Sequence, residues 1–570
     1  MRLRLRLMAL LIMASLAVVV GRLAQLQLIE PEKYLAQPFQ NHKLERKIAE
    51  AIADGAITPG VDDTVSIAPG RFRPWETRYI KRLAIKGILR GRDGHLFVES
   101  GFTRRLPSDR GGDPAALIRG RILDRNGRRL AWTAIENGRR VRHYALPEAC
   151  FHLLGSNRAD RAQPGIETFC DAVLRTPDPS LAARWRSFWL GPRPGLDVRT
   201  TLDSRLQEVA WRALEGKKGA LVAIDPTTGD LLAVVTSPSL SSSASSREVF
   251  AAHDAGPDGP LLNRAFDGYY PPGSTFKTIV AAAVLGDNVI DLNERLRCDG
   301  MLRPIPGAGY TIHDHEYGLE EGFRGHHPSA GPGFTLADAY AVSCNVTFAR
   351  LGMLTGADRL TAWAKPFGFG RAIPVRLLDD TPAFHVIPSR VFPAGTVKKI
   401  NPAQLAQTAI GQFEVRATPL QMALVAAAVA NDGVIMIPRL VSGAATPAGR
   451  WVTRTRPDPW LRPLLPDQAK VLKRLMRSAI TDGTGRRLAS ESYMLAGKTG
   501  TAEIPGSAPH GWFIAFAPAN APRIAVAALV EHGGYGSASA GPIARAVIDT
   551  WLGDSEATGR DSEAPVAEVH

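Results

Sequence analysis

The pattern of apolar and polar residues predicts an antiparallel sheet built from segments that are far apart in the sequence. Apolar runs at 220–224 and 231–235 flank the turn Asp-Pro-Thr-Thr-Gly-Asp, and this arrangement predicts a β-hairpin. Two later apolar runs, at 512–517 and 524–530, have the length and the flanking turn residues of strands. We expect these runs and a strand that contains Lys498 to complete one sheet.

Helical patterns occupy the chain before and between these strands. Residues 204–214 place their apolar side chains on one face of a helix, with Ser204 and Gln207 as a predicted capping box and Gly216 as the stop signal. The chain from 274 to 430 is expected to be mostly helical. The sequence therefore predicts an α/β (α+β) domain in which helices flank a central antiparallel sheet, with a helical subdomain and a cleft between the two.

The amino terminus carries an apolar segment after three arginines. Because basic residues stay on the cytoplasmic side, we predict that 7–29 is a signal-anchor transmembrane helix and 1–6 a cytoplasmic tail. The rest of the chain would then lie outside the cytoplasm. A cleaved signal peptide is the alternative, with 15–17 as a small-x-small site. The anchor is favoured because apolar residues continue past that site.

Length and charge narrow the functional classes. With 570 residues and 45% hydrophobic content, the chain is long enough for two or three domains. Its formal net charge is +14, but the arginines are scattered and no nucleic-acid-binding motif accompanies them. We therefore expect an anionic membrane surface, and no nucleic acid, to be the partner of this charge.

A candidate nucleophile and its base follow a Pro-Pro-Gly turn at 271–273. Ser274 and Lys277 are three residues apart, so on a helix they share one face, and the apolar run 279–285 predicts that this helix is buried. The positive end of a helix favours an attacking alkoxide. Burial and a second cation, Lys498, are expected to lower the pKa of Lys277 and let it act as a base.

Two further motifs follow in order along the chain, Ser343-Cys344-Asn345 and then Lys498-Thr499-Gly500-Thr501. Each short motif is common by chance, and Ser-x-Asn alone is typical of a turn or a helix cap. All three motifs in this order indicate a serine nucleophile that is activated by lysine instead of histidine.

With these motifs the chain resembles the class B (monofunctional) penicillin-binding proteins of the serine DD-peptidase and β-lactamase superfamily. The likeness extends to Gly411-Gln412 with the segment 418–423 (TPLQMA), to 510–518, and to 119–127 (RGRILDRNG) upstream. The resemblance implies a peptidoglycan D,D-transpeptidase that crosslinks stem peptides and is acylated by β-lactam antibiotics.

The resemblance also implies a role for the residues of the first two motifs. Ser274 is expected to form the acyl-enzyme with the penultimate D-alanine of a D-Ala-D-Ala stem peptide, and Lys277 to take its proton. Ser343 is expected to relay a proton to the leaving group, tuned electrostatically by Lys498. Asn345 is expected to hydrogen-bond the substrate backbone.

The third motif is expected to bind the terminal carboxylate of the substrate. On a strand, Thr499 and Thr501 alternate with Lys498 and Gly500, so their hydroxyls are expected to meet that carboxylate. The backbone N–H groups of Ser274 and Thr501 are expected to form the oxyanion hole. Gly500 has no side chain to block the approach.

The same reading divides the chain into regions. We predict a membrane-proximal stalk at 30–118, a β-rich non-catalytic pedestal at 119–200, the transpeptidase domain at 201–553 and a disordered tail at 554–570. The catalytic domain is expected on the outer side of a bacterial cytoplasmic membrane, held by a single span. No glycosyltransferase motif precedes residue 200, so the resemblance implies a separate SEDS-type glycosyltransferase as membrane partner.

Two other functions share these motifs. A membrane-anchored serine β-lactamase uses the same chemistry, but the long non-catalytic region before Ser274 argues against it. A catalytically silent scaffold of the cell-wall machinery would keep the fold for contacts alone, and the presence of every motif residue argues against that. The choices between division and elongation, and between transpeptidation and carboxypeptidation, stay open.

Four cysteines and a His-containing segment raise the questions of disulfides and metal. Cys150 with Cys170 is the first pairing to consider, against free thiols in a domain that needs no staple. Cys344 is expected to be a small buried filler. Cys298 precedes several histidines, His313, His315, His326 and His327. Because their spacing is irregular, we predict an exposed polar insertion near the site, with no metal and no cofactor.

Overall fold

The computed structural model describes residues 117–156, 165–180, 193–244, 259–298, 300–302, 311–314, 333–378 and 384–560, and a few short pieces outside these ranges. The chain divides into two compact units, Met1–Ala116 and Leu117–His570. The predicted tail and anchor at 1–29 lie outside the described residues, as does 561–570. Within the described part, no helix combines the length and the apolar character that crossing a membrane requires.

In the first unit, the structure describes two short antiparallel strand pairs. β1 (Ile57–Pro59) pairs with β2 (Val65–Ile67), and β3 (Leu89–Arg92) pairs with β4 (His95–Val98). Both pairs fall within the predicted stalk, 30–118. Almost all of the other stalk residues lie outside the described part.

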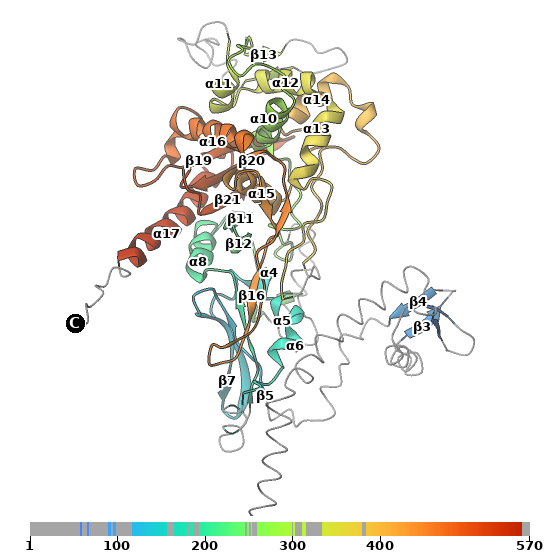
Figure 1. Cartoon of the computed structure of the whole chain (residues 1–570), viewed down its shortest axis with the longest axis vertical. Helices are drawn as coiled ribbons and strands as arrows, with labels where there is room; N and C mark the ends of the chain where they lie inside the picture. Colours follow the sequence, from blue (N-terminus) through green and yellow to red (C-terminus); the bar gives the residue numbers. More distant parts are fainter. Residues whose placement is uncertain are drawn as a thin grey trace, which may run out of the picture. The chain divides into compact units, whose positions relative to one another are not determined.

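A five-stranded antiparallel sheet lies at the centre of the predicted transpeptidase domain, 201–553 (Figure 1). Its strands in spatial order are β12 (Leu231–Ser237), β11 (Gly219–Ile224), β21 (Ile524–Val530), β20 (Ser507–Ala517) and β19 (Ala496–Ile504). The predicted hairpin is confirmed, since β11 and β12 pair along their length. The predicted closing strands are confirmed as well.

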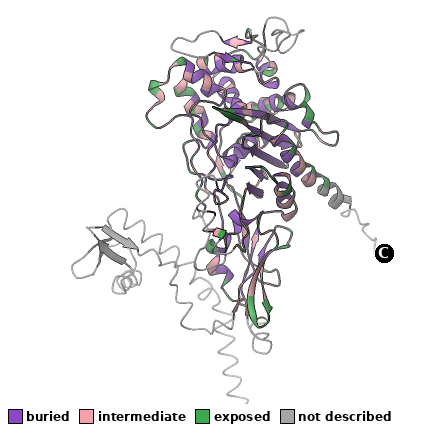
Figure 2. Ribbon diagram, turned by 180° about the vertical axis from the view of Figure 1, so that it is seen from behind, coloured by how far each residue is buried: buried purple, intermediate pink, exposed green. Residues whose placement is uncertain are grey.

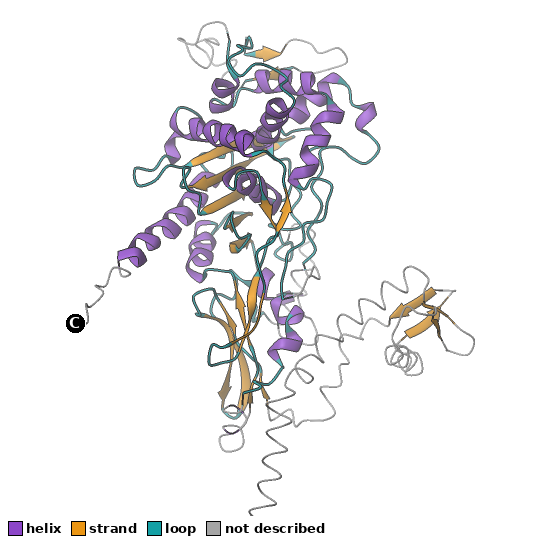
Figure 3. Ribbon diagram, in the orientation of Figure 1, coloured by secondary structure: helices purple, strands orange, loops and turns teal. Residues whose placement is uncertain are grey.

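Helices cover both faces of this sheet (Figure 3). α8 (Ser204–Ala213) and α17 (Ala540–Arg560) pack on one face, and α15 (Pro419–Ala430) and α16 (Pro466–Thr481) pack on the other. The other α-helices in the described part of the second unit are α4 (Phe151–Leu154), α5 (Ile166–Phe169), α6 (Asp171–Leu174), α10 (Lys277–Gly286), α11 (Leu336–Ala341), α12 (Asn345–Thr355), α13 (Ala357–Ala364) and α14 (Pro402–Ala409). α17 continues past residue 553, where the predicted tail begins.

Alternate side chains of the sheet enter two different cores. On β20, Trp512 and Ile514 are buried in the core that contains α15, whereas Phe513 and Ala515 are buried in the core that contains α8 and α17. Figure 2 shows most of the sheet buried, and the exposed residues lie at the end where β19 turns into β20. Because helices cover both faces, both faces are apolar, and the strands appear in the sequence as continuous apolar runs.

A six-stranded sheet forms the pedestal region. Its strands in spatial order are β17 (Trp451–Arg454), β16 (Val441–Ala445), β10 (Asp197–Thr200), β6 (Ile122–Leu123), β7 (Arg129–Glu136) and β8 (Arg139–Tyr144). The last four come from the predicted pedestal, 119–200. β16 and β17 come from within the predicted transpeptidase domain, so the chain returns to the pedestal sheet after α15.

The RGRILDRNG segment contains the turn between β6 and β7. Asp124 Oδ1 accepts hydrogen bonds from the backbone N–H groups of Asn126 and Arg128, at 2.9 and 2.8 Å. Asp124 Oδ2 accepts a bond from Ser204 Oγ at 2.7 Å. One buried carboxylate therefore shapes the turn and ties the pedestal to the start of α8.

The predicted capping box of α8 is wrong. The N-cap is Asp203, whose carboxylate accepts a hydrogen bond from the N–H of Arg205 at 3.0 Å. Gln207 instead lies buried, where its amide donates to the carbonyls of Ala149 and Val234 at 2.7 and 2.6 Å. A buried amide with tertiary acceptors gains more than a local cap, because it also satisfies two main-chain carbonyls.

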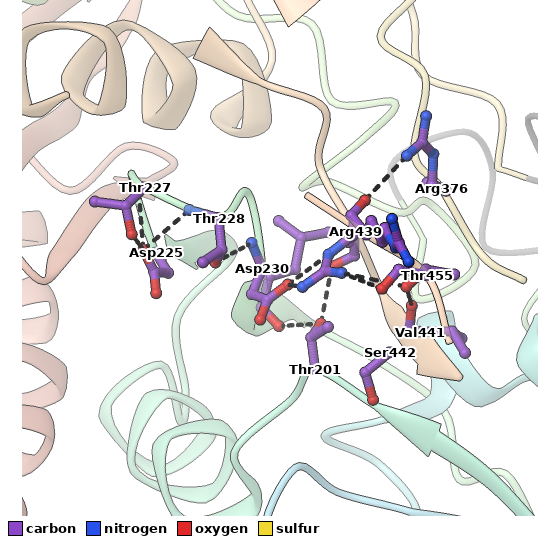
Figure 4. A network of polar contacts seen from close by, with 12 residues as sticks. Thr201, Asp225, Thr227, Thr228, Asp230, Arg376, Arg439, Val441, Ser442 and Thr455 are labelled. Carbon is purple, nitrogen blue, oxygen red and sulfur yellow. Dashed lines mark hydrogen bonds and ion pairs between the residues drawn. The ribbon is translucent and has the colours of Figure 1, made fainter. Parts of the chain in front are cut away.

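A largely buried ion pair joins the five-stranded sheet to the segment that leads into the six-stranded sheet (Figure 4). Arg439 Nε donates to Asp230 Oδ1 at 2.8 Å, and Arg439 Nη1 donates to Thr455 O at 2.9 Å. Thr201 Oγ1 lies 2.8 Å from the carbonyl oxygens of both Leu231 and Arg439. These contacts connect the start of β12, the segment before β16 and the chain that follows β10.

Candidate active site

Ser274 lies in a short 3-10 turn, not in the first turn of an α-helix. The turn η5 (Gly273–Phe276) leads directly into α10, which begins at Lys277 and is buried. The predicted buried helix is therefore confirmed from Lys277 onward, but its entry is tighter than expected. Thr275 Oγ1 donates to the carbonyl of Pro272 at 2.6 Å, which closes the turn around Ser274.

Neighbouring segments hold this turn from two sides. Trp512 Nε1 donates to the carbonyl of Pro271 at 2.9 Å. The N–H of Gly273 donates to the carbonyl of Gly411 at 3.0 Å. A Cβ on Gly411 would lie 1.9 Å from the oxygen of Gly273, so this position requires glycine. The segments noted around Gly411 and Trp512 thus contact the candidate nucleophile turn.

Lys277 connects the first two motifs. Its side chain is fully buried, and its Nζ donates to Ser343 O at 2.7 Å, to Ser343 Oγ at 3.3 Å and to Asn345 Oδ1 at 2.8 Å. Among the described residues, no hydrogen bond joins it directly to Ser274. The structure therefore brings the base to the second motif and places the serine one turn away from it.

The second motif occupies the turn between α11 and α12. Ser343 has a φ of 60°, in the left-handed region that a side chain other than glycine rarely adopts. Cys344 caps α12, since its Sγ accepts a hydrogen bond from the N–H of Thr347 at 3.2 Å. Cys344 is buried as predicted, but it also has this structural contact.

The third motif lies on β19, at the edge of the sheet beside the nucleophile turn. A Cβ on Gly500 would lie 2.9 Å from Thr275 Cγ2 and 3.1 Å from Pro272 O. A Cβ on Gly273 would lie 2.7 Å from Thr501 O. Two glycines therefore allow the strand and the turn to pack in direct contact.

The side chains of the third motif have different surroundings. Lys498 is fully buried, its Nζ lies 5.6 Å from the centre of the Tyr340 ring, and it donates to the carbonyl of Thr499 at 3.2 Å. Thr499 Oγ1 lies 2.5 Å from Thr484 Oγ1 and so has a partner within the protein. Thr501 is only half-buried. Of the two threonines, Thr501 is the more accessible to a ligand.

Burial lowers the pKa of both lysines. It lowers the pKa of Lys277 to about 8, although the neighbouring Cys344 and Asp314 act in the opposite direction. Burial, and then repulsion from Lys277, lowers the pKa of Lys498 well below its usual value. A neutral amine is therefore available at Lys277 near pH 8, which general-base chemistry requires.

Asp314 is a residue of this region that the sequence pattern did not single out by itself. Its Oδ1 accepts a hydrogen bond from the N–H of Asn345 at 2.5 Å, and Asn345 Nδ2 donates to the carbonyl of His313 at 3.0 Å. Asp314 is buried, not part of an exposed insertion as predicted, and of the described residues 311–314 only His313 is exposed. Its distance along the chain from Asn345 left no local signal of this contact.

None of the four cysteines forms a disulfide in this structure. The pairing of Cys150 with Cys170 is therefore absent from this structure. Cys298 lies beside Cys344 instead, with 3.4 Å between the sulfur atoms. His315, His326 and His327, which belong to the predicted polar insertion, lie outside the described residues.

Comparison with known proteins identifies the family. Residues 219–549, which contain all three motifs, match the family described as penicillin binding protein transpeptidase domain. The chain belongs to this family. Penicillin-binding proteins of class B are also its relatives over most of its length. It is 36% identical over 461 residues to the peptidoglycan D,D-transpeptidase PbpA of Mycolicibacterium smegmatis, covering 76% of this chain and 89% of that protein.

Other relatives agree. The peptidoglycan D,D-transpeptidase MrdA of Acinetobacter baumannii is 32% identical over 382 residues, covering 63% of this penicillin-binding protein and 54% of MrdA. The fold matches that of penicillin-binding protein A from M. tuberculosis, solved as an imipenem acyl-enzyme complex. That match has a TM-score of 0.66 and 34% identity, and it covers 77% of this chain and all of the other.

Proposed function

We propose that this penicillin-binding protein is a peptidoglycan D,D-transpeptidase whose Ser274 is acylated by stem peptides and by β-lactams. The observation that carries the proposal is the convergence of three distant motifs. Lys277 bonds to Ser343 and Asn345, and the strand with Thr501 packs against the turn that contains Ser274. The names of the relatives and the acyl-enzyme complex of the structural neighbour support the reaction class.

Acylation follows from this arrangement. Ser274 Oγ attacks the carbonyl carbon of the penultimate D-alanine, and the hydroxyl proton passes to the neutral amine of Lys277. The backbone N–H groups of Ser274 and Thr501 stabilise the oxyanion. The C–N bond to the terminal D-alanine then breaks, and the proton passes from Lys277 through Ser343 Oγ to the departing amine.

Crosslinking completes the cycle. An amine of a second stem peptide attacks the acyl-enzyme carbonyl and gives its proton back along the same path, which releases Ser274. Asn345 holds the substrate backbone, and Thr501 binds the terminal carboxylate with Thr499 behind it. Lys498 acts electrostatically, because protons on both buried amines would repel each other, and burial and this repulsion lower the pKa of Lys498.

Intact-mass spectrometry tests this proposal. The full-length protein incubated with penicillin G should gain the mass of one ring-opened antibiotic and keep it for hours, while Ser274→Ala gains none. Ser507→Ala removes an exposed hydroxyl on β20 and is the matched control, which should acylate normally. Rapid loss of the adduct with turnover of antibiotic would indicate a β-lactamase. A complete lack of adduct in the wild type would indicate a catalytically silent scaffold.

We also propose how the chain is placed in the cell. The apolar stretch 7–29 is a single signal anchor, with 1–6 in the cytoplasm and the catalytic domain outside it. Along the chain, the stalk (30–118) and the pedestal (119–200) then come between the anchor and the transpeptidase domain. A SEDS-type glycosyltransferase would supply the glycan strand that this enzyme crosslinks.

Fusion reporters test that topology. Alkaline phosphatase folds only outside the cytoplasm, so a fusion after residue 200 should be active, and deletion of 7–29 should abolish its activity. Activity that persists without 7–29 would contradict the anchor. Affinity purification from membranes that contain a tagged SEDS protein should recover the full-length chain, and failure to recover it under crosslinking would contradict that partner.

A further inference from the structure

Each of the two buried lysines of the active site lies over an aromatic ring. Lys277 Nζ lies 5.5 Å from the centre of the Phe348 ring, and Lys498 Nζ lies 5.6 Å from the centre of the Tyr340 ring. Both rings are fully buried. A cation within about 6 Å of a ring centre is attracted by the negative face of the ring, and the attraction is strongest where water is excluded. Each ring can therefore stabilise the protonated form of its lysine.

The two rings come from the helices on either side of the second motif. Tyr340 precedes Ser343 on α11, and Phe348 follows it on α12. The rings contact each other edge to face, with 6.1 Å between their centres. The hydroxyl of Tyr340 lies 2.9 Å from Oγ1 of Thr278 on α10, and burial raises its pKa, so this ring stays uncharged. Contacts with α10 and with each other therefore fix both rings.

The hydrogen-bond partners of both lysines are neutral. Lys277 Nζ donates to the carbonyl and hydroxyl oxygens of Ser343 and to Oδ1 of Asn345. Lys498 Nζ donates to a carbonyl oxygen. In the part of the chain that the structure describes, no carboxylate forms an ion pair with either amine. Over the amine of Lys277, the ring face is thus a further source of negative potential in direct reach.

The titratable groups near Lys277 act on its pKa in the direction opposite to burial. Burial has the larger effect and lowers this pKa to about 8. Cys344, at the start of α12, raises it, and so does Asp314, which follows the hairpin of β13 (Met301–Leu302) and β14 (Ile312–His313). The amine is therefore neutral at rest above a pH of about 8.

Positive charge forms on Lys277 during acylation. When Ser274 Oγ attacks, its proton passes to Lys277 Nζ, and the neutral amine becomes an ammonium ion in a buried site. An interaction made with the ammonium ion alone stabilises the transition state more than the resting enzyme, and such a difference raises the rate. A ring that is already fixed needs no reorganisation when the charge appears.

We propose that the face of the Phe348 ring stabilises the ammonium ion that forms on Lys277 when Ser274 is acylated. The proposal rests on the function proposed above. The proton leaves Ser274 Oγ as the bond from oxygen to the carbonyl carbon forms, stays on Lys277 Nζ over the ring, and passes through Ser343 Oγ to the departing amine as the C–N bond breaks. Phe348 acts through Lys277, so it is a positioning residue and gains or loses no proton.

Stepwise fluorination of the ring tests the proposal without changing the shape of the core. Codon suppression in the full-length protein replaces Phe348 with phenylalanines that carry one, two or three ring fluorines, which weaken the negative face in steps. The second-order rate constant for acylation by penicillin G is then measured across the titration of the lysine. The trifluorinated ring should move the midpoint, about 8 in the wild type, to a pH lower by about one unit. The plateau rate should fall about three-fold, because the base is weaker.

The matched control is Phe151, a buried ring on α4. The same fluorinated residues at that position should leave the midpoint and the plateau unchanged. Phe348→Leu, which removes the ring but keeps an apolar side chain, should shift the midpoint in the same direction as the trifluorinated ring.

Three results would contradict the account, and they are distinguishable. A midpoint that stays in place across the Phe348 series would overturn the role of the ring and leave the acylation of Ser274 intact. Equal shifts in the Phe348 and Phe151 series would do the same. A wild-type protein that penicillin G does not acylate at any pH would overturn the proposed function, and the role of the ring with it.

Discussion

Two regions of this protein contain buried basic side chains, and these differ in whether a carboxylate pairs with them. In the polar network beside β12, Arg439 is paired with the carboxylate of Asp230 and bonds two further oxygens of Thr455 (Figure 4). In the active site, Lys277 and Lys498 are fully buried, and among the described residues neither forms an ion pair. Their bonds go to carbonyl, hydroxyl and amide oxygens.

This difference corresponds to two roles: the paired arginine stabilises the fold, and the unpaired lysines take part in the chemistry. A buried cation without a counter-ion loses its proton more easily, because burial penalises the charged form. The pKa of Lys277 falls to about 8 for this reason. Arginine stays protonated in proteins, so the network around Arg439 can hold a fixed charge but cannot exchange a proton. Lysine is the residue type that can serve as the base.

The largest effect is expected when the base is removed. Lys277→Met should slow acylation by penicillin about a thousand-fold, because general-base catalysis contributes on this scale. Stopped-flow fluorescence with a labelled penicillin measures the rate. Lys470→Met, an exposed lysine on α16, is the control and should leave the rate unchanged. A Lys277→Met rate within ten-fold of wild type would refute the assignment of the base.

Removal of the paired arginine, Arg439, is expected to lower stability and leave the acylation rate unchanged. Arg439→Met leaves Asp230 buried without its partner and should lower the free energy of unfolding by about 3 kcal/mol. The acylation rate of the folded fraction should stay unchanged, since this network lies outside the active site. Chemical denaturation measures the loss. Arg212→Met breaks an exposed pair with Glu208 and should cost no more than about 0.5 kcal/mol. Equal losses for both variants would contradict the comparison.

A smaller effect on the acylation rate is expected when a hydrogen bond that holds the nucleophile turn is removed. Trp512→Phe keeps an aromatic ring in the core but removes the hydrogen bond to the carbonyl of Pro271. One such bond contributes about 1 kcal/mol, so the acylation rate should fall about five-fold. The same stopped-flow assay measures it. An unchanged rate would show that the turn is held without this bond.

The sequence predicted the parts of the fold that follow local patterns. The hairpin, the closing strands and the buried helix after Ser274 are confirmed, since apolar runs and turn residues mark them. The sequence analysis did not predict that β16 and β17 join the pedestal sheet, because the local pattern of a short strand does not indicate which strand it pairs with. The capping box of α8 failed because Gln207 finds better acceptors in the core.

Of the candidate site, the motif residues were predicted from the sequence and their tertiary contacts were not. The motif residues were visible because their types and order carry the chemistry, and the structure brings Lys277, Ser343 and Asn345 together. The role of Asp314 was not visible in the sequence, since the hairpin of β13 and β14 brings it into contact with Asn345. The lowered pKa of Lys277 was expected from burial and from Lys498, and burial is its cause in this structure. The direct contacts of Lys277 with the second motif depend on the tertiary arrangement.

The pH dependence of acylation tests the central claim most directly. If Lys277 acts as a neutral base with a pKa lowered to about 8, the acylation rate should rise as pH increases through about 8 and level off above it. A lysine with its ordinary pKa would still be gaining rate near pH 10.5. A rate independent of pH across this range, or a midpoint above about 10, would contradict the account.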